Sequence, residues 1–192
     1  ERLPKLDVTV INRGVGGEVA STTAQRLLVE AKAEKPDLVI WQVGTNDAVR
    51  GVASSETTAI IVRGIAFLRG RGTDVMLMDP QFFPRIAEDA AYAGVVARIG
   101  ALASAEKVPV LRRFDAMRHW ASRPNPPPVL YEDAFHMNDL GYACVAEVLA
   151  EALVRRVEAA ATSDPAMTSG SSAAAPRSSA AAGPEAGEAL TH

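Results

Sequence analysis

Residues 38–43 are the feature that most limits how this chain can fold. They read Leu-Val-Ile-Trp-Gln-Val, a short apolar run interrupted only by Gln42. Runs of this length and composition are typical of strands buried on both faces, as in parallel sheets covered by helices. The run ends at Gly44, and Thr45-Asn46-Asp47 follows. Because ligands of open α/β sheets bind beyond the carboxyl ends of the strands, this stretch indicates either a simple turn or the edge of a site.

The rest of the chain alternates predicted strands and predicted helices. Residues 7–12 alternate and are rich in β-branched side chains, which predicts a strand running into a glycine-rich turn. Apolar residues at helical spacing predict helices, and two further apolar runs predict strands. The helices are expected at residues 21–35, 54–69, 87–105, 114–121 and 139–157, and the strands at 74–78 and 108–111. This alternation indicates the α/β class with a parallel sheet.

Composition excludes several classes of function. The 192 residues carry a net charge of -3 and no basic block, which argues against a nucleic-acid-binding surface. Cys144 is the single cysteine, so the sequence offers neither an intrachain disulfide nor a thiolate metal cluster. No apolar run approaches the roughly 20 residues that a membrane span needs. No group of residues has the spacing of metal ligands, and we expect no cofactor.

The character of the sequence changes after residue 158. Residues 159–192 are almost entirely Ala, Ser, Gly, Pro, Thr and Glu. Such a segment cannot bury enough apolar surface to offset the entropy lost on ordering. We therefore expect one domain over residues 1–158 and a disordered tail over residues 159–192.

Two pairs of residues supply the parts of an acyl-transfer site. Asp133 and His136 are three residues apart, which lets their side chains lie on one side of a turn. A carboxylate beside an imidazole fixes the tautomer of the ring and stabilises the imidazolium that forms when the ring accepts a proton. Asn46 and the backbone N–H of Gly17 are donors of the kind that stabilise a developing oxyanion. The sequence therefore predicts His136 as a general base and Asp133 as its orienting carboxylate.

Three blocks of the sequence resemble the SGNH hydrolases, a family also known as GDSL-type esterases and lipases. The blocks are Asn12-Arg13-Gly14-Val15-Gly16-Gly17, the stretch at residues 36–47 that ends in Gly44-Thr45-Asn46-Asp47, and Asp133-Ala134-Phe135-His136-Met137-Asn138-Asp139-Leu140-Gly141. They correspond, in order, to the second, third and fifth sequence blocks of that family. Together they span most of the chain before the tail.

The resemblance implies a fold, an activity and a site. The fold is a three-layer α/β/α sandwich with a parallel, flavodoxin-like sheet, and the activity is ester hydrolysis through a serine acyl-enzyme. The substrate is then a small-molecule ester. By position, Gly17 and Asn46 are the oxyanion donors of the family. Asp133 is the orienting residue and His136 is the base.

The first block of that family, Gly-Asp-Ser, does not occur in this sequence. In the family it carries the nucleophile at the end of the first strand, which is understood to lie between the strands expected at residues 7–12 and 38–43. Residues 1–6 are too few to contain that strand and its loop. We therefore expect the first strand and the nucleophile to lie upstream of this chain. Ser21, Ser54 and Ser55 are interpreted as helix caps, not as nucleophiles.

Two other functions remain open at this stage. A non-catalytic module that binds an acyl or carbohydrate ligand would use the same edge of the same fold. A flavodoxin-like nucleotide binder is disfavoured, because Val19 takes the place of the last small residue in the glycine fingerprint that begins at Gly14.

Overall fold

The computed structural model describes residues 6–163, with residues 160–163 described by their backbone alone. The chain forms two compact units, Glu1–Val154 and Arg155–His192. In the second unit, residues 155–163 are helical, so the chain is still regular beyond the domain boundary expected at residue 158. The remainder of the predicted tail, residues 164–192, lies outside the described residues.

A parallel sheet organises the first unit. Its strands are β1 (Leu38–Gln42), β2 (Asp74–Met78) and β3 (Val110–Leu111), in the order β1-β2-β3. Leu38 pairs with Asp74 and Gln42 with Met78, so β1 and β2 reach the same edge of the sheet. The predicted α/β class with a parallel sheet is confirmed.

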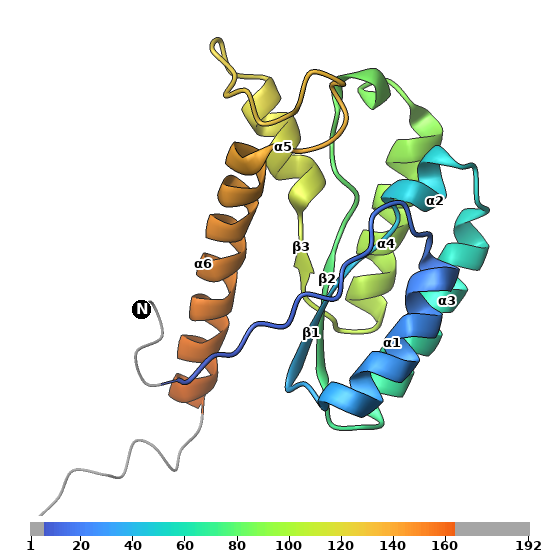
Figure 1. Cartoon of the computed structure of the whole chain (residues 1–192), viewed down its shortest axis with the longest axis vertical. Coiled ribbons are helices and arrows are strands. Elements are labelled where there is room, and N and C mark those ends of the chain that lie inside the picture. The colour runs from blue at the N-terminus through green and yellow to red at the C-terminus, as the bar shows by residue number, and fades with distance from the viewer. Residues whose placement is uncertain (1–5, 164–192) are drawn as a thin grey trace, which may run out of the picture. The chain divides into compact units, whose positions relative to one another are not determined.

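Three helices cover one face of this sheet (Figure 1). They are α1 (Ala20–Glu34), α3 (Ser54–Arg69) and α4 (Ala90–Ala105). Their apolar stripes meet the strands in one hydrophobic cluster, because apolar residues at helical spacing place their side chains on one side of each helix. The most deeply buried members of that cluster are Ile61, Ile65, Leu68, Leu77 and Ile99.

The other face is covered by α5 (Arg113–Ala121) and by the first part of α6 (Asp139–Ser163). These helices form a second cluster with the ends of β2 and β3, through Phe114, Met117 and Val145. No residue of β1 belongs to it, and Ile40 is 38% exposed on that side. The prediction that this strand is buried on both faces is therefore wrong, because α5 and α6 cover the β2–β3 side of the sheet.

The prediction of a strand at residues 7–12 is also wrong. This segment has no regular structure, and Val8 and Val10 are 61% and 85% exposed. A strand is stable only when a neighbour takes up its backbone hydrogen bonds, and within residues 6–163 β1 pairs with β2 alone. Ion pairs hold the following residues to α1 instead: Arg13 contacts Glu30 and Glu34, and Arg26 contacts Glu18.

The interpretation of Ser21, Ser54 and Ser55 as helix caps is also wrong. The residues at the cap positions of α1 and α3 are Val19 and Ala53, without a side-chain hydrogen bond at either. The carboxylate of Asp47 accepts the first N–H of α1 at 3.0 Å, so a residue distant in sequence does the work of a cap.

The segment that follows β1 also differs from the sequence prediction. Gly44 leads into a short helix, α2 (Thr45–Val49), where a turn had been one expectation. Asp47 lies inside this helix. At the start of the last helix, Asn138 caps α6, because its Oδ1 accepts the N–H of Gly141 at 3.0 Å. A short 3-10 helix, η1 (Pro84–Ile86), completes the described elements.

Two helical glycines test the packing of α3 against β1. A Cβ added at Gly64 would lie 2.4 Å from the Trp41 ring, whereas one added at Gly94 of α4 would meet nothing within 4 Å. We expect Gly64→Ala to lower the free energy of unfolding by about 1–3 kcal/mol, since Trp41 is buried and cannot give way. Gly94→Ala should raise it by up to about 1 kcal/mol, since alanine favours helix. Urea unfolding of both variants measures this, and equal effects would contradict the packing described.

Candidate active site

Asp133 and His136 form a hydrogen-bonded pair in the loop before α6. The Asp133 Oδ2 and His136 Nδ1 atoms are 2.6 Å apart. Asp133 Oδ1 accepts the backbone N–H groups of Phe135 and His136, each at 2.9 Å. These bonds, led by the one to the His136 ring, lower the pKa of Asp133 to about 2. The carboxylate is therefore ionised across the physiological pH range.

This pairing decides which nitrogen of His136 can act as a base. An ionised carboxylate only accepts hydrogen bonds, so the ring nitrogen facing Asp133, Nδ1, must carry the proton. In the neutral ring the lone pair then lies on Nε2. The side chains of His136 and Asp133 are 68% and 49% exposed, so the pair is open to solvent and to a reactant.

Aromatic packing and backbone bonds hold the loop that carries the pair. The ring of Phe135 packs edge-on against the rings of Phe83 and His136, with centroid distances of 4.8 Å and 4.7 Å. The carbonyl of His136 accepts the N–H of Tyr131 at 2.8 Å, and Met137 is buried. The exposed base is thus mounted on a fixed segment of backbone.

The pair lines an open groove of about 650 Å³. Its walls are Tyr131, Glu132, Asp133, His136, Met137 and Tyr142. A few polar groups among aromatic and apolar side chains are typical of small-molecule sites. This groove is the candidate substrate site.

The second predicted pair lies where the glycine-rich segment meets α2. The side-chain amide of Asn46 donates one N–H to the carbonyl of Glu18 at 2.9 Å, and Glu18 directly follows Gly17. Gly17 has a φ of +80°, in the left-handed region that favours glycine. An amide nitrogen carries two N–H groups, so this bond orients Asn46 and leaves the other N–H for a ligand.

Gln81 connects the two pairs, and the sequence did not single it out. Its backbone N–H donates to the Thr45 hydroxyl at 3.2 Å, and its side-chain amide donates to the carbonyl of Phe135 at 2.7 Å. Thr45 precedes Asn46 and Phe135 precedes His136. The structure therefore brings each predicted pair together and links the pairs through one residue of the loop after β2. The only sequence signal was the position of that loop at the carboxyl edge.

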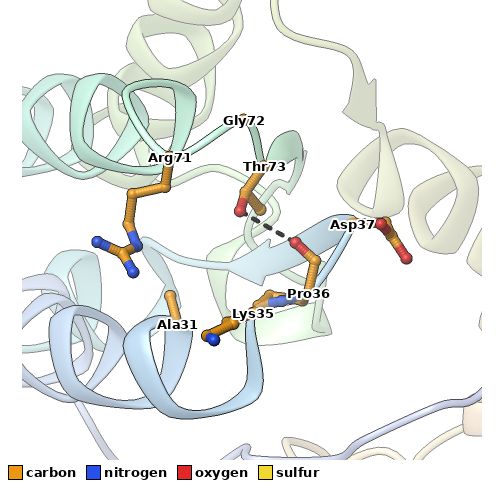
Figure 2. Close-up of a pocket in the computed structure, with 7 residues that line it drawn as sticks. All are labelled: Ala31, Lys35, Pro36, Asp37, Arg71, Gly72 and Thr73. Carbon is orange, nitrogen blue, oxygen red and sulfur yellow. Dashed lines mark hydrogen bonds between the residues drawn. The ribbon is translucent and has the colours of Figure 1, made fainter. Parts of the chain in front are cut away.

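A smaller pocket of about 220 Å³ lies at the opposite, amino-terminal edge of β1 and β2. Figure 2 shows Arg71 and Asp37 pointing to different sides of it, with the Thr73 hydroxyl bonded to the carbonyl of Pro36 at 3.0 Å. The Thr73 hydroxyl is therefore already hydrogen-bonded to the backbone. Among its lining residues no imidazole accompanies that hydroxyl, so this pocket offers no nucleophile–base pair.

Within residues 6–163, the structure has neither a metal-binding cluster nor a membrane-spanning helix. None of the groups of His, Cys, Asp and Glu within residues 6–163 could hold a metal ion. Over the same residues, no helix has the length and apolar character needed to cross a membrane.

The sequence and the fold are similar to those of known proteins. A family model described as non-GDSL lipase-like matches residues 1–159. An arylesterase from Vibrio mimicus is 26% identical over 152 residues, which are 79% of this chain and 72% of that protein. Esterase TesA from Pseudomonas aeruginosa is 30% identical over 112 residues, 56% of this chain and 53% of that one. A lipase/acylhydrolase structure from Enterococcus faecalis has the same fold, with a TM-score of 0.69 at 23% identity over 79% of this chain and 78% of that chain.

The Asp133–His136 bond makes a prediction about ionisation. Because the His136 ring is the largest cause of the lowered Asp133 pKa, His136→Ala should raise that pKa from about 2 toward the ordinary value of 3.8. The interaction is therefore complete above pH 4 and is lost as the pH falls through about 2. Carboxyl ¹³C NMR of Asp133 measures the midpoint. His119→Ala, in exposed helix surface, is the control and should leave it unchanged. An unchanged midpoint in His136→Ala would mean that the pair does not form in solution.

Proposed function

The chain belongs to the non-GDSL lipase-like family, and we propose that it carries the base and oxyanion donors of an ester hydrolase. Membership confirms the resemblance to SGNH-type hydrolases that the sequence blocks indicated. The names of two relatives, an arylesterase and an esterase, support ester hydrolysis as the reaction. The observation that carries the proposal is the 2.6 Å contact between Asp133 and His136, which leaves the exposed Nε2 as a base.

The proposed reaction proceeds through a serine acyl-enzyme. His136 Nε2 removes the proton of a serine hydroxyl as that oxygen bonds to the ester carbonyl carbon, and Asp133 stabilises the imidazolium formed. The second N–H of Asn46 and the N–H of Gly17 donate to the oxyanion. The ring then protonates the leaving alkoxide, and the acyl-enzyme forms. In the second half, the same ring takes a proton from a water whose oxygen bonds to the acyl carbon. The bond from that carbon to the serine oxygen then breaks, the ring returns the proton to the serine oxygen, and the acid leaves.

The serine itself is the part of the proposal that lies outside the described site. Within residues 6–163, no hydroxyl hydrogen-bonds to His136. Ser21, Ser54 and Ser55 lie in the first turns of α1 and α3. We propose that a further strand pairs with the open edge of β1 and brings a serine to the carboxyl edge of the sheet. The exposed face of β1, including Ile40, is the surface such a strand and its neighbours would cover.

A second candidate is a non-catalytic module that binds an acyl or carbohydrate ligand in the groove. The same absence of a bonded hydroxyl beside His136, within the described part of the chain, favours it. The two candidates differ in one observable, since only the hydrolase turns over an ester.

Mutation of the site in the full-length gene product separates these candidates. With p-nitrophenyl acetate as substrate, His136→Ala should lower kcat by at least about 10³-fold, since the serine loses its base. Asn46→Ala should lower it by about 10²–10³-fold, as loss of one oxyanion donor does. His119→Ala is the control and should retain full activity, because His119 is exposed on α5.

The outcomes are distinct. Near-normal turnover in His136→Ala would overturn the assignment of the base. Ligand binding without turnover, in the unaltered full-length protein, would select the binding module instead.

A further inference from the structure

We propose that Gln81 is a positioning residue that holds the loop bearing His136 in place against α2, the helix that bears Asn46. The proposal rests on the function proposed above, because it assigns Gln81 a part in the same site. It concerns a residue that neither accepts a proton nor contacts the groove.

Gln81 is bound at three points. Its backbone N–H donates to the Thr45 hydroxyl at 3.2 Å, and its side-chain Nε2 donates to the Phe135 carbonyl at 2.7 Å. Its own carbonyl accepts the hydroxyl of Tyr92 at 2.7 Å. The residue is 7% exposed, so these bonds do not compete with bulk water. One side chain and its backbone therefore tie three separate segments together.

The bond between Asp133 and His136 cannot fix the His136 loop relative to the helix that bears Asn46. Asp133 and His136 lie in the same loop, so the bond between them fixes the ring relative to that loop only. Chemistry at an ester carbonyl requires the base and the oxyanion donors to be fixed relative to each other. The two hydrogen bonds donated by Gln81 join the backbone of this loop to Thr45, the first residue of α2. The packing of Phe83 against Phe135 adds contact area, but apolar contact is not directional.

A buried arginine supports the other end of this connection. Arg113 is 1% exposed, and its Nη2 donates to the Thr45 hydroxyl at 3.3 Å while its Nε donates to the carbonyl of Asp79 at 3.2 Å. Burial lowers the pKa of Arg113 to about 10, which still leaves it charged at neutral pH. The Thr45 hydroxyl oxygen thus accepts hydrogen bonds from Arg113 and from Gln81, and these two bonds fix the orientation of the Thr45 side chain.

The chemistry of the position calls for an amide. The Phe135 carbonyl needs a donor at the end of a side chain as long as that of glutamine. Methionine has the same length and no donor. Glutamate is ionised at neutral pH and would set a carboxylate oxygen against the carbonyl oxygen. Gln81→Met therefore removes one hydrogen bond and keeps the packing volume.

Amide hydrogen exchange of the 192-residue chain tests the anchoring without any ester turnover. Gln81→Met should speed exchange at Tyr131 and His136 by about fivefold to tenfold, the effect of losing one hydrogen bond of about 1 kcal/mol. The control is Tyr92→Phe, which removes the contacts of the Tyr92 hydroxyl with the Gln81 carbonyl and the Thr45 hydroxyl and leaves the bond to Phe135 intact. In that variant the same two amides should change by less than about twofold.

A second variant guards against a general loss of stability. In Gln81→Glu, the carboxylic acid can donate a hydrogen bond to the Phe135 carbonyl and the carboxylate cannot. Protection of the loop amides, measured against the unstructured chain at the same pH, should therefore be restored at low pH and lost at neutral pH. Unchanged loop exchange in both Gln81 variants would overturn the proposal, as would an equal increase in Tyr92→Phe.

The kcat and KM of the full-length gene product distinguish a positioning role of Gln81 from a purely structural one. If Gln81 positions the base, Gln81→Met should lower kcat by about tenfold to a hundredfold and leave KM within about twofold. A rise in KM with unchanged kcat would overturn the positioning role. The exchange measurement decides the anchoring and the His136→Ala assay decides the hydrolase function, so the two failures are distinguishable.

Discussion

Parallel pairing of β1 with β2 is the constraint on which the candidate site depends. Because Gln42 pairs with Met78, both strands end at the same edge, and the turn after β1 lies beside the loop after β2. Gly44 makes this close approach possible. It has a φ of +100°, and a Cβ there would lie 3.0 Å from the Cγ atom of Pro80, in the loop after β2, and 2.5 Å from the Cδ1 atom of Ile99 in α4. Thr45 and Gln81 can therefore bond directly.

The two halves of the site are stabilised in different ways. Thr45, Gln81 and Arg113 are buried, and their hydrogen bonds are protected from water. Asp133 and His136 are exposed, and a polar side-chain pair in such a place contributes little to folding. Their geometry instead depends on backbone N–H groups that the Asp133 carboxylate accepts within one turn. This exposure suits a general base, because the base must stay accessible to the group that it deprotonates.

Sequence reasoning succeeded where the pattern is local. The strand at residues 74–78 and the helix that begins near Phe114 follow from the periodicity of their own apolar residues. The Asp133–His136 pair was predictable because three residues of spacing suffice to bring the side chains together. The strand prediction for residues 7–12 failed, because β-branched residues favour a strand only when a neighbouring strand is there to pair with. Asp47 and Gln81 could not be found from sequence, since their partners lie in segments far along the chain.

The central proposal is that His136 is the general base for a serine nucleophile. The most direct measurement is the site of covalent labelling by a fluorophosphonate in the full-length gene product, located by peptide mass spectrometry. The account predicts one labelled serine, other than Ser21, Ser54 and Ser55, and loss of the label in His136→Ala. A label on Ser21, Ser54 or Ser55, or a label that persists in His136→Ala, would contradict it.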